Sequence, residues 1–199
     1  LLEFWFVIIL NNKHKNSLAL ESTIFESSTK GVKGFLKKVF LKRLSFVYAS
    51  GSLQKDLLLA LNFEGKIILT YGVGIIRKPE INQLRPEGVK NRILYIGRLS
   101  EVKNIETLIN VFNKLPDIIL EIYGEGPLKN QLVSMANSNI IFKGPINNKY
   151  LQDLFMNFDY LVLLSKSEPW GLVVEEASYF NIPVLVSSRC GVSDIIKKE

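Results

Sequence analysis

From Arg92 onward, short apolar runs alternate with longer stretches in which apolar residues recur every three or four positions. Short apolar runs are typical of buried strands, and the longer pattern is typical of helices that bury one face. Strands are predicted at 92–97, 117–124, 139–144, 159–165 and 183–188, and helices at 106–115, 126–136, 149–157 and 171–180. This alternation predicts βαβ units around a parallel sheet with helices on both faces, which is the doubly wound α/β fold.

Residues 1–70 show the same alternation less regularly. Helices are predicted at 1–10 and 52–61, strands at 17–21, 46–50 and 66–70, and a basic segment spans 31–44. The apolar run at 1–10 is too short to span a bilayer, and it lacks the basic flank and cleavage site of a signal peptide. Because the chain also begins without Met, we interpret it as an internal piece of a longer protein.

A stretch with little periodicity separates the two α/β regions. It reads YGVGIIRKPEINQLRPEGVKN and contains several glycines and two prolines, a composition typical of a linker. We therefore predict a first domain over 1–72, a linker over 73–91 and a second domain over 92–199, both domains being Rossmann-like and incomplete.

Ligands of open α/β sheets bind outside the carboxyl ends of the strands. The turns that follow the predicted strands of the second domain are therefore the places where candidate site residues are expected. Four of these turns read GRLSEVKN, GEGP, KGPINN and SKSEPWG.

The composition narrows the class of ligand. The formal net charge is +6, which favours an anionic partner such as a nucleotide, a phosphosugar, nucleic acid or an acidic lipid, and charge alone does not choose among them. The chain has one cysteine, Cys190, which excludes an internal disulfide framework and fits a reducing compartment.

Two cations in GRLSEVKN form the first candidate site. Arg98 and Lys103 lie beside a predicted helix start, where free amides and the helix dipole favour anions. Arginine can fork to two phosphate oxygens and lysine can act as a point charge, so the pair suits a diphosphate. The alternative is ordinary surface charge in a loop. In GEGP, Gly124 and Gly126 either permit a ligand to approach or simply form the turn.

The segment SEPWGLVVEEA carries the second candidate site. Glu168 lies in the loop, and the helix is predicted to start around Gly171, so the amides of Gly171 and Leu172 would be free to bind phosphate oxygens. Glu176, within that helix, can accept two hydrogen bonds from neighbouring hydroxyls of a ribose. The alternative is that Glu175 and Glu176 are both solvated acids.

As a set, GRLSEVKN, IYGEGP and SEPWGLVVEEASYFNIPVLVSS resemble the nucleotide-binding half of retaining glycosyltransferases of family 4, which have the GT-B fold. The resemblance implies that 92–199 binds a nucleotide-sugar donor and that 1–72 is part of an acceptor-side domain. By resemblance, Arg98 and Lys103 hold the donor diphosphate, Glu176 holds the ribose, and Glu168 holds hydroxyls of the transferred sugar.

Some residues depart from the family pattern. Trp170 stands where Phe is common, and Asn181 replaces a glycine, although Asn also tolerates a left-handed turn. Glu21, in ALEST, occupies the place of an acceptor-side histidine, so we treat it as a candidate acceptor-facing catalytic residue. Cys190 is interpreted as a small packed residue, because the single histidine, His14, lies in the other domain.

The resemblance implies transfer of a sugar from a UDP- or GDP-sugar to an acceptor hydroxyl with retention of configuration, in polysaccharide or glycolipid biosynthesis. No metal or other cofactor is expected, because Arg98, Lys103 and a helix N-terminus can stabilise the leaving diphosphate. The alternatives are a non-catalytic nucleotide-binding module and a sugar-nucleotide epimerase of the same fold.

The segment 30–43 holds six cations and no acid, interleaved with apolar residues. On a helix it would form a basic amphipathic surface that attracts anionic lipid. The alternative is a solvated helix face over the domain core. The expected location is cytoplasmic, with a peripheral position on the inner face of the membrane, and nucleic acid is not an expected partner.

Overall fold

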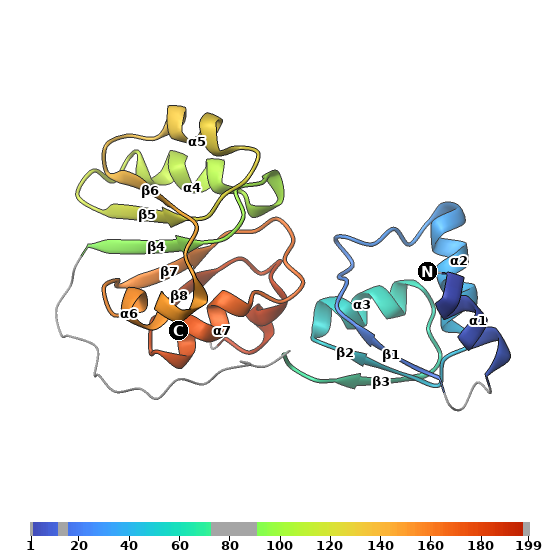
Figure 1. Cartoon of the computed structure of the whole chain (residues 1–199). Helices are drawn as coiled ribbons and strands as arrows, with labels where there is room; N and C mark the ends of the chain where they lie inside the picture. Colours follow the sequence, from blue (N-terminus) through green and yellow to red (C-terminus); the bar gives the residue numbers. More distant parts are fainter. Residues whose placement is uncertain (1, 12–15, 73–90, 197–199) are drawn as a thin grey trace. The chain divides into compact units, whose positions relative to one another are not determined.

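The computed structural model describes residues 2–11, 16–72 and 91–196, and the predicted linker therefore lies almost wholly outside the described residues. Contacts divide the chain into two compact units (Figure 1). Unit 1 comprises Leu1–Val73 with Gly191–Glu199, and unit 2 comprises Gly74–Cys190.

Unit 1 is a parallel α/β unit with three strands in the order β1-β2-β3. Its helices are α1 (Leu2–Leu10), α2 (Gly31–Leu41) and α3 (Ser52–Ala60), its strands are β1 (Ser17–Leu20), β2 (Phe46–Ala49) and β3 (Lys66–Leu69), and a short 3-10 helix, η4 (Gly191–Asp194), belongs to it as well. Every helix and strand predicted in this region is present. The parallel connections follow because each strand is joined to the next by a helix.

The core of unit 1 lies on one face of its sheet. The register places Leu18, Val47 and Ile67 in one row across the three strands. A second row holds Leu20, Ala49 and Leu69. Because side chains alternate along a strand, both rows point to the same face. Leucines of α2 and α3 pack against them in a single apolar cluster.

Unit 2 has a five-stranded parallel sheet in the order β6-β5-β4-β7-β8. Its strands are β4 (Arg92–Ile96), β5 (Ile119–Tyr123), β6 (Ile140–Gly144), β7 (Tyr160–Leu163) and β8 (Val184–Val186). Its helices are α4 (Ile105–Phe112), α5 (Lys129–Met135), α6 (Leu151–Phe155) and α7 (Leu172–Tyr179), with 3-10 helices η2 (Glu101–Lys103) and η3 (Asn148–Tyr150). The predicted strands and helices are confirmed, each within a few residues of the expected ends.

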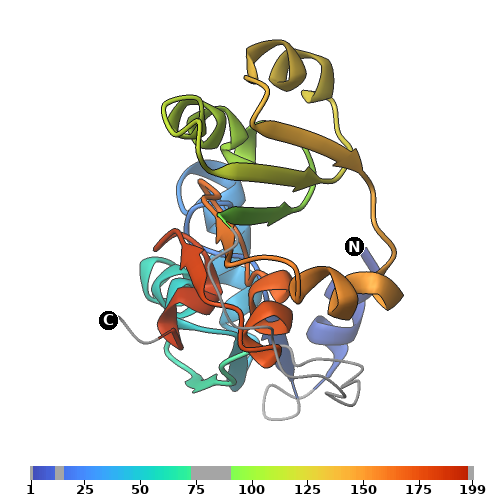
Figure 2. The same ribbon diagram turned by 90° about the vertical axis from the view of Figure 1, so that its left-hand side faces the viewer.

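Helices cover both faces of this sheet, as the sequence predicted. Figures 1 and 2 show α4 and α5 over one side and α6 and α7 over the other. The rings of Phe155 and Phe180 pack at 5.7 Å between centroids, which ties α6 to the end of α7. After α7 the chain turns through Asn181, whose φ of 57° confirms the predicted left-handed turn. No helix in the described part of the chain is long and apolar enough to cross a membrane.

The carboxylate of Glu121 is buried within unit 2. Glu121 on β5 is only 3% exposed, and its carboxylate is ion-paired with Arg92 and lies 3.7 Å from the Lys143 ammonium. It also accepts a hydrogen bond from the Tyr123 hydroxyl at 3.2 Å. Burial, together with the Glu121 charge, raises the pKa of Tyr123. The two cations offset the cost of burying the acid, because a buried carboxylate is tolerated only when it is paired.

Candidate functional site

The loops that follow β4 and β7 meet at the carboxyl edge of the unit 2 sheet. β4 comes first in the chain, and its neighbours are β5 on one side and β7 on the other, so the strand order reverses between β4 and β7. Such a switch point leaves a crevice where ligands of doubly wound sheets bind. The loop after β4 carries Arg98 and Lys103, and the loop after β7 carries Glu168.

Lys103 is positioned by the short helix η2. The amide of Lys103 donates to the Ser100 carbonyl at 3.0 Å, which closes the turn. Asn104 then takes a left-handed conformation, with φ at 57°, and α4 begins. The Lys166 amide donates to the Val102 carbonyl at 2.7 Å, so the loop after β7 is held against η2. This contact brings Lys103 within reach of Glu168.

Lys103 and Glu168 form a partly buried ion pair, in which the side chains are 20% and 14% exposed. The Ser165 hydroxyl donates to the same carboxylate oxygen, Oε2, at 3.3 Å. The Glu168 amide donates to the Arg189 carbonyl at 3.2 Å, which holds the loop against the chain that follows β8. Among the described residues, the side chains of Lys103 and Ser165 donate to Oε2 and no side chain donates to the other oxygen, Oε1.

The loop that carries Arg98 rests on a buried tyrosine. Tyr95, on β4, is fully buried, and its hydroxyl donates to the Arg98 carbonyl at 3.3 Å. Burial, with a further contribution from the Glu168 charge, raises the pKa of Tyr95. The Arg98 side chain is exposed, and no contact joins it to Lys103 or Glu168 within the described residues. The backbone of this loop is therefore anchored, while the guanidinium is available to a ligand.

Gly124 and Gly126 serve a close contact between two loops. A β-carbon on Gly124 would lie 1.9 Å from the Gly97 carbonyl oxygen, and one on Gly126 would lie 2.3 Å from the Leu99 carbonyl oxygen. The Leu99 amide donates to the Glu125 carbonyl at 2.9 Å. The glycines thus let the loop after β5 pack directly on the loop that carries Arg98.

Replacing Gly126 with alanine is expected to destabilise unit 2 by about 1–2 kcal/mol, because the added carbon overlaps backbone atoms that cannot rotate away. Urea unfolding followed by circular dichroism measures the effect. Asn130→Ala, at an exposed position of α5, is the control and should leave the midpoint nearly unchanged. An unchanged midpoint for Gly126→Ala would contradict the close loop packing.

The N-terminus of α7 begins where it was predicted. Gly171 is the N-cap residue, with φ at 102°, and no side chain caps the helix. A positive φ favours glycine at this position. The preceding Trp170 is only 4% exposed and anchors the turn. The first amides of α7, beginning with that of Leu172, can therefore donate to an anion.

Glu176 is half-buried on α7. Burial raises the pKa of Glu176, and the neighbouring Glu175 carboxylate adds to the increase. Within the described residues, Oε2 of Glu175 is buried without a hydrogen-bond partner. Glu176 is thus held in an environment that disfavours its charged form, which is common at functional sites.

Replacing Glu176 with glutamine is expected to stabilise the protein at neutral pH. A carboxyl whose pKa is raised on folding costs stability when it is ionised, and this cost appears as the pH rises through the folded pKa. The difference in unfolding free energy should therefore shrink on acidification and vanish below the unfolded pKa of about 4.3. Glu101→Gln, at an exposed position, is the control. If the unfolding free energy of the two variants depended on pH in the same way, the predicted effect of Glu176 would be contradicted.

Cys190 forms an isolated parallel β-bridge with Glu168 and is fully buried. Burial, followed by the Glu168 charge, raises the pKa of its thiol to about 11. A thiol with a raised pKa is a poor nucleophile. The interpretation of Cys190 as a packed residue therefore agrees with the structure, and His14 lies outside the described residues.

Sequence reasoning missed two side chains of this site, Ser165 and Tyr95. Both lie at or just beyond the carboxyl ends of buried strands, and a polar group at that place is the signal that could have found them. Glu21 follows β1 in unit 1 and is exposed, and its backbone carbonyl accepts a hydrogen bond from the side-chain Nε2 of Gln54 at 2.9 Å. It belongs to a different unit from the other candidates.

The sequence of the chain matches a known family. Residues 76–199, more than half of the chain, match the family described as Glycosyl transferases group 1. The sulfoquinovosyl transferase SQD2 of Arabidopsis thaliana is 32% identical over 114 residues, covering 57% of this chain and 22% of that protein. The uncharacterized glycosyltransferase MJ1607 of Methanocaldococcus jannaschii is 32% identical over 140 residues, covering 65% of this chain and 36% of that protein. The matched region is thus about a fifth to a third of these relatives.

Solved structures share the fold at lower identity. A GtfA/B complex superposes with a TM-score of 0.71 at 20% identity, covering 98% of this chain and 42% of that chain. Alr3699/HepE of Anabaena, in complex with UDP and glucose, gives a TM-score of 0.69 at 16% identity, covering 92% of this chain and 55% of that chain. The fold of the two units is the GT-B type. The family match and the fold together confirm the resemblance to glycosyltransferases of the GT-B fold, and the chain belongs to the Glycosyl transferases group 1 family.

Proposed function

We propose that the protein transfers a sugar from a nucleotide-diphosphate sugar to an acceptor hydroxyl, with retention of configuration. The observation that carries this proposal is the Lys103–Glu168 ion pair at the switch point of the unit 2 sheet. It combines a cation suited to phosphate with an acid suited to sugar hydroxyls, in the place where doubly wound sheets bind nucleotides.

The nucleotide-sugar donor would lie along the loops that follow β4, β5 and β7 of unit 2. Arg98 and Lys103 bind the diphosphate, helped by the amides of Gly171 and Leu172 at the start of α7. Oε1 of Glu168 accepts from hydroxyls of the transferred sugar, while Oε2 is held by Lys103 and Ser165. The Glu176 carboxylate accepts from the ribose. The backbone of the Gly124–Gly126 loop supports the loop of Arg98 from behind.

The transfer itself is proposed as a front-face substitution. The bond between the anomeric carbon and the phosphate oxygen breaks, and the acceptor oxygen forms its bond to the same face of that carbon. The acceptor proton passes to an oxygen of the leaving phosphate. Arg98, Lys103 and the α7 N-terminus stabilise the charge that the diphosphate gains, so the proposed mechanism requires no metal. Glu21 is proposed to face the acceptor.

The names of similar proteins support the classes of donor and acceptor. Two solved neighbours are complexes with UDP and a sugar, one of them the pneumococcal O-GlcNAc transferase GtfA with UDP and GlcNAc. Curated relatives include the O-antigen biosynthesis glycosyltransferase WbnH of Escherichia coli, 31% identical over 121 residues. We therefore propose a UDP-sugar donor ahead of a GDP-sugar, a hexosyl group, and an acceptor used in polysaccharide or glycolipid synthesis.

Calorimetric titration of UDP and GDP into the protein, followed by a transfer assay on the longest product of the gene, tests this function. Nucleotide binding with transfer of labelled sugar is the expected result. Binding without turnover would instead support a nucleotide-binding module, and release of isomerised sugar nucleotide would support an epimerase. Absence of binding to either nucleotide would reject the proposal.

We also propose that α2 docks on an anionic membrane, which would place the protein at the cytoplasmic face of a bilayer. Apolar residues on α2 are exposed at helical spacing, namely Val32, Phe35, Leu36 and Val39. Six cations lie within 30–43, and the segment has no acid. Exposed apolar groups flanked by lysine are typical of helices that lie in a membrane interface.

Flotation with phosphatidylglycerol vesicles measures this docking. Lys38→Glu combined with Lys42→Glu should reduce the bound fraction by more than tenfold, because each cation near an anionic surface contributes about 1 kcal/mol. Lys66→Glu with Lys55→Glu, in the same unit but outside α2, is the control of equal charge. If both pairs of substitutions reduced the bound fraction equally, the vesicles would be attracting the net charge of the protein, and docking by α2 would be contradicted.

A further inference from the structure

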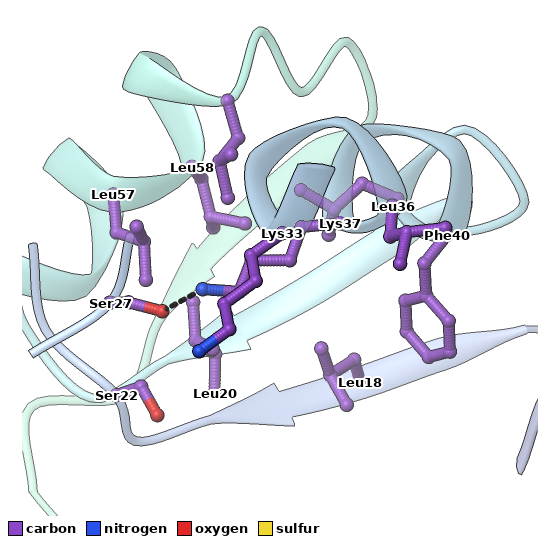
Figure 3. A pocket seen from close by; sticks show the side chains of 12 residues that line it. Leu18, Leu20, Ser22, Ser27, Lys33, Leu36, Lys37, Phe40, Leu57 and Leu58 are labelled. Carbon is purple, nitrogen blue, oxygen red and sulfur yellow. Dashed lines mark hydrogen bonds between the residues drawn. The ribbon is translucent and has the colours of Figure 1, made fainter. Parts of the chain in front are cut away.

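Unit 1 contains an apolar groove with a volume of about 530 Å³ between α2, α3 and β1. Its size falls in the range of about 300–1,000 Å³ that is usual for small-molecule sites. Figure 3 shows Leu18 and Leu20 of β1 below Leu36 and Phe40 of α2, with Leu57 and Leu58 of α3 near one end. Leu18 and Leu20 are only partly buried, because α2 does not close over them.

The polar groups of this groove are gathered in one part of it. Lys33 and Lys37 of α2 point toward Ser22 and Ser27 of the loop after β1 (Figure 3). The Lys37 ammonium donates to the Ser27 hydroxyl at 2.6 Å and to the Ser28 carbonyl at 2.9 Å. These partners are neutral, so they leave the positive charge uncompensated.

Neither lysine is ion-paired within the described residues. The acid nearest to Ser27 in sequence is Glu26, and its carboxylate accepts from the Thr23 amide at 3.4 Å. Segment 30–43 contributes no acid either. The groove thus combines an apolar trough with a cationic, hydroxyl-bearing end.

We propose that this groove binds a single-chain lipid phosphate, with the hydrocarbon chain on the leucines and the phosphate between Lys33, Lys37 and Ser22. A hydrocarbon chain is stabilised by the apolar surface that it buries. A phosphate supplies the charge and the acceptor oxygens that two ammonium groups and a hydroxyl can bind. Binding at this site is independent of sugar transfer, so its test does not rely on turnover.

The test compares four probes on the chain: decyl phosphate below its critical micelle concentration, decanol, inorganic phosphate and decyltrimethylammonium. Calorimetry gives the affinity, and methyl NMR of the leucines gives the place. Decyl phosphate is expected to bind most tightly and to shift the methyl signals of Leu18, Leu20 and Leu57. The probes that lack either the tail or the negative head should bind at least tenfold more weakly.

Paired variants on α2 separate the groove from the helix surface. Lys33→Gln with Lys37→Gln should weaken decyl phosphate binding by about 30-fold and leave decanol unaffected, since each lysine contributes about 1 kcal/mol to an anion. Lys38→Gln with Lys42→Gln makes the same change of charge outside the groove and should have less than a threefold effect. Circular dichroism confirms that each variant is folded.

Substitutions in the apolar wall of the groove give a second, independent test of where the hydrocarbon chain binds. Leu36→Gln alters an exposed residue that lines the groove, and Val39→Gln alters an exposed residue of the same helix that does not. Only the first should weaken binding of both decyl phosphate and decanol. This result would place the hydrocarbon chain in the groove.

Three results would overturn the proposal. One is absence of decyl phosphate binding, and another is equal loss for the two lysine pairs, which would indicate attraction to the helix surface or to a membrane. The third is loss of decyl phosphate binding in a longer product of the same gene, in which the methyl NMR signals of the groove leucines are already shifted before the probe is added. That result would show that a segment of the protein itself occupies the groove.

Discussion

Replacing Lys103 with methionine is expected to lower kcat/KM for sugar transfer by about 10²–10³-fold, measured in the longest product of the gene. The loss of one charged group that stabilises a developing oxyanion has an effect of this size. Lys103 is a partly buried cation at the switch point of the unit 2 sheet, and methionine keeps most of its apolar length. The affinity for UDP should fall with the activity, because the diphosphate is common to substrate and product.

Two further variants identify what Lys103 does. Lys114→Met, at an exposed position beyond α4, is the control for the change of charge and should keep full activity. Glu168→Gln should also reduce transfer severely but leave the affinity for UDP nearly unchanged, because the acid is proposed to hold the sugar and not the phosphate. Normal UDP binding in Lys103→Met would mean that the lysine only positions Glu168.

Replacing Glu121 with alanine is expected to destabilise the protein by about 3 kcal/mol. The change removes a 3% exposed carboxylate and leaves Arg92 and Lys143 without their shared partner inside the sheet. It also removes the acceptor of the Tyr123 hydroxyl. The expected loss of stability lies near the lower end of the range for broken buried ion pairs. The Arg92 and Lys143 side chains are 34% and 41% exposed, so water can solvate their charges once Glu121 is removed.

Urea unfolding followed by tryptophan fluorescence and circular dichroism measures this loss. The control is Glu125→Ala, which removes an ion pair with Lys129 whose side chains are 38% and 49% exposed. Exposed pairs between residues four apart contribute only about 0.3–0.5 kcal/mol. A similar small effect for Glu121→Ala would mean that the network around Glu121 does not stabilise the sheet.

Most elements of the fold could be predicted from the sequence, because their signals are local. The predicted strands and helices are confirmed, and Gly171 and Asn181 mark the start and the end of α7 as expected. The roles assigned to Arg98, Lys103, Glu168 and Glu176 remain predictions. The structural role of Gly124 and Gly126 could not be predicted, since a glycine in a loop does not reveal which backbone segment packs against it.

By itself, the sequence determined the parallel α/β class, the strands and helices, and the turns in which a ligand site was to be expected. Hydrophobic periodicity and turn residues act over a few positions, so one chain suffices to recognise them. Only the tertiary structure decided that β4 lies between β5 and β7, that Lys103 pairs with Glu168, and that Glu121 is buried with two cations. These features join residues that are far apart in the chain, and the packing of the sheet selects them.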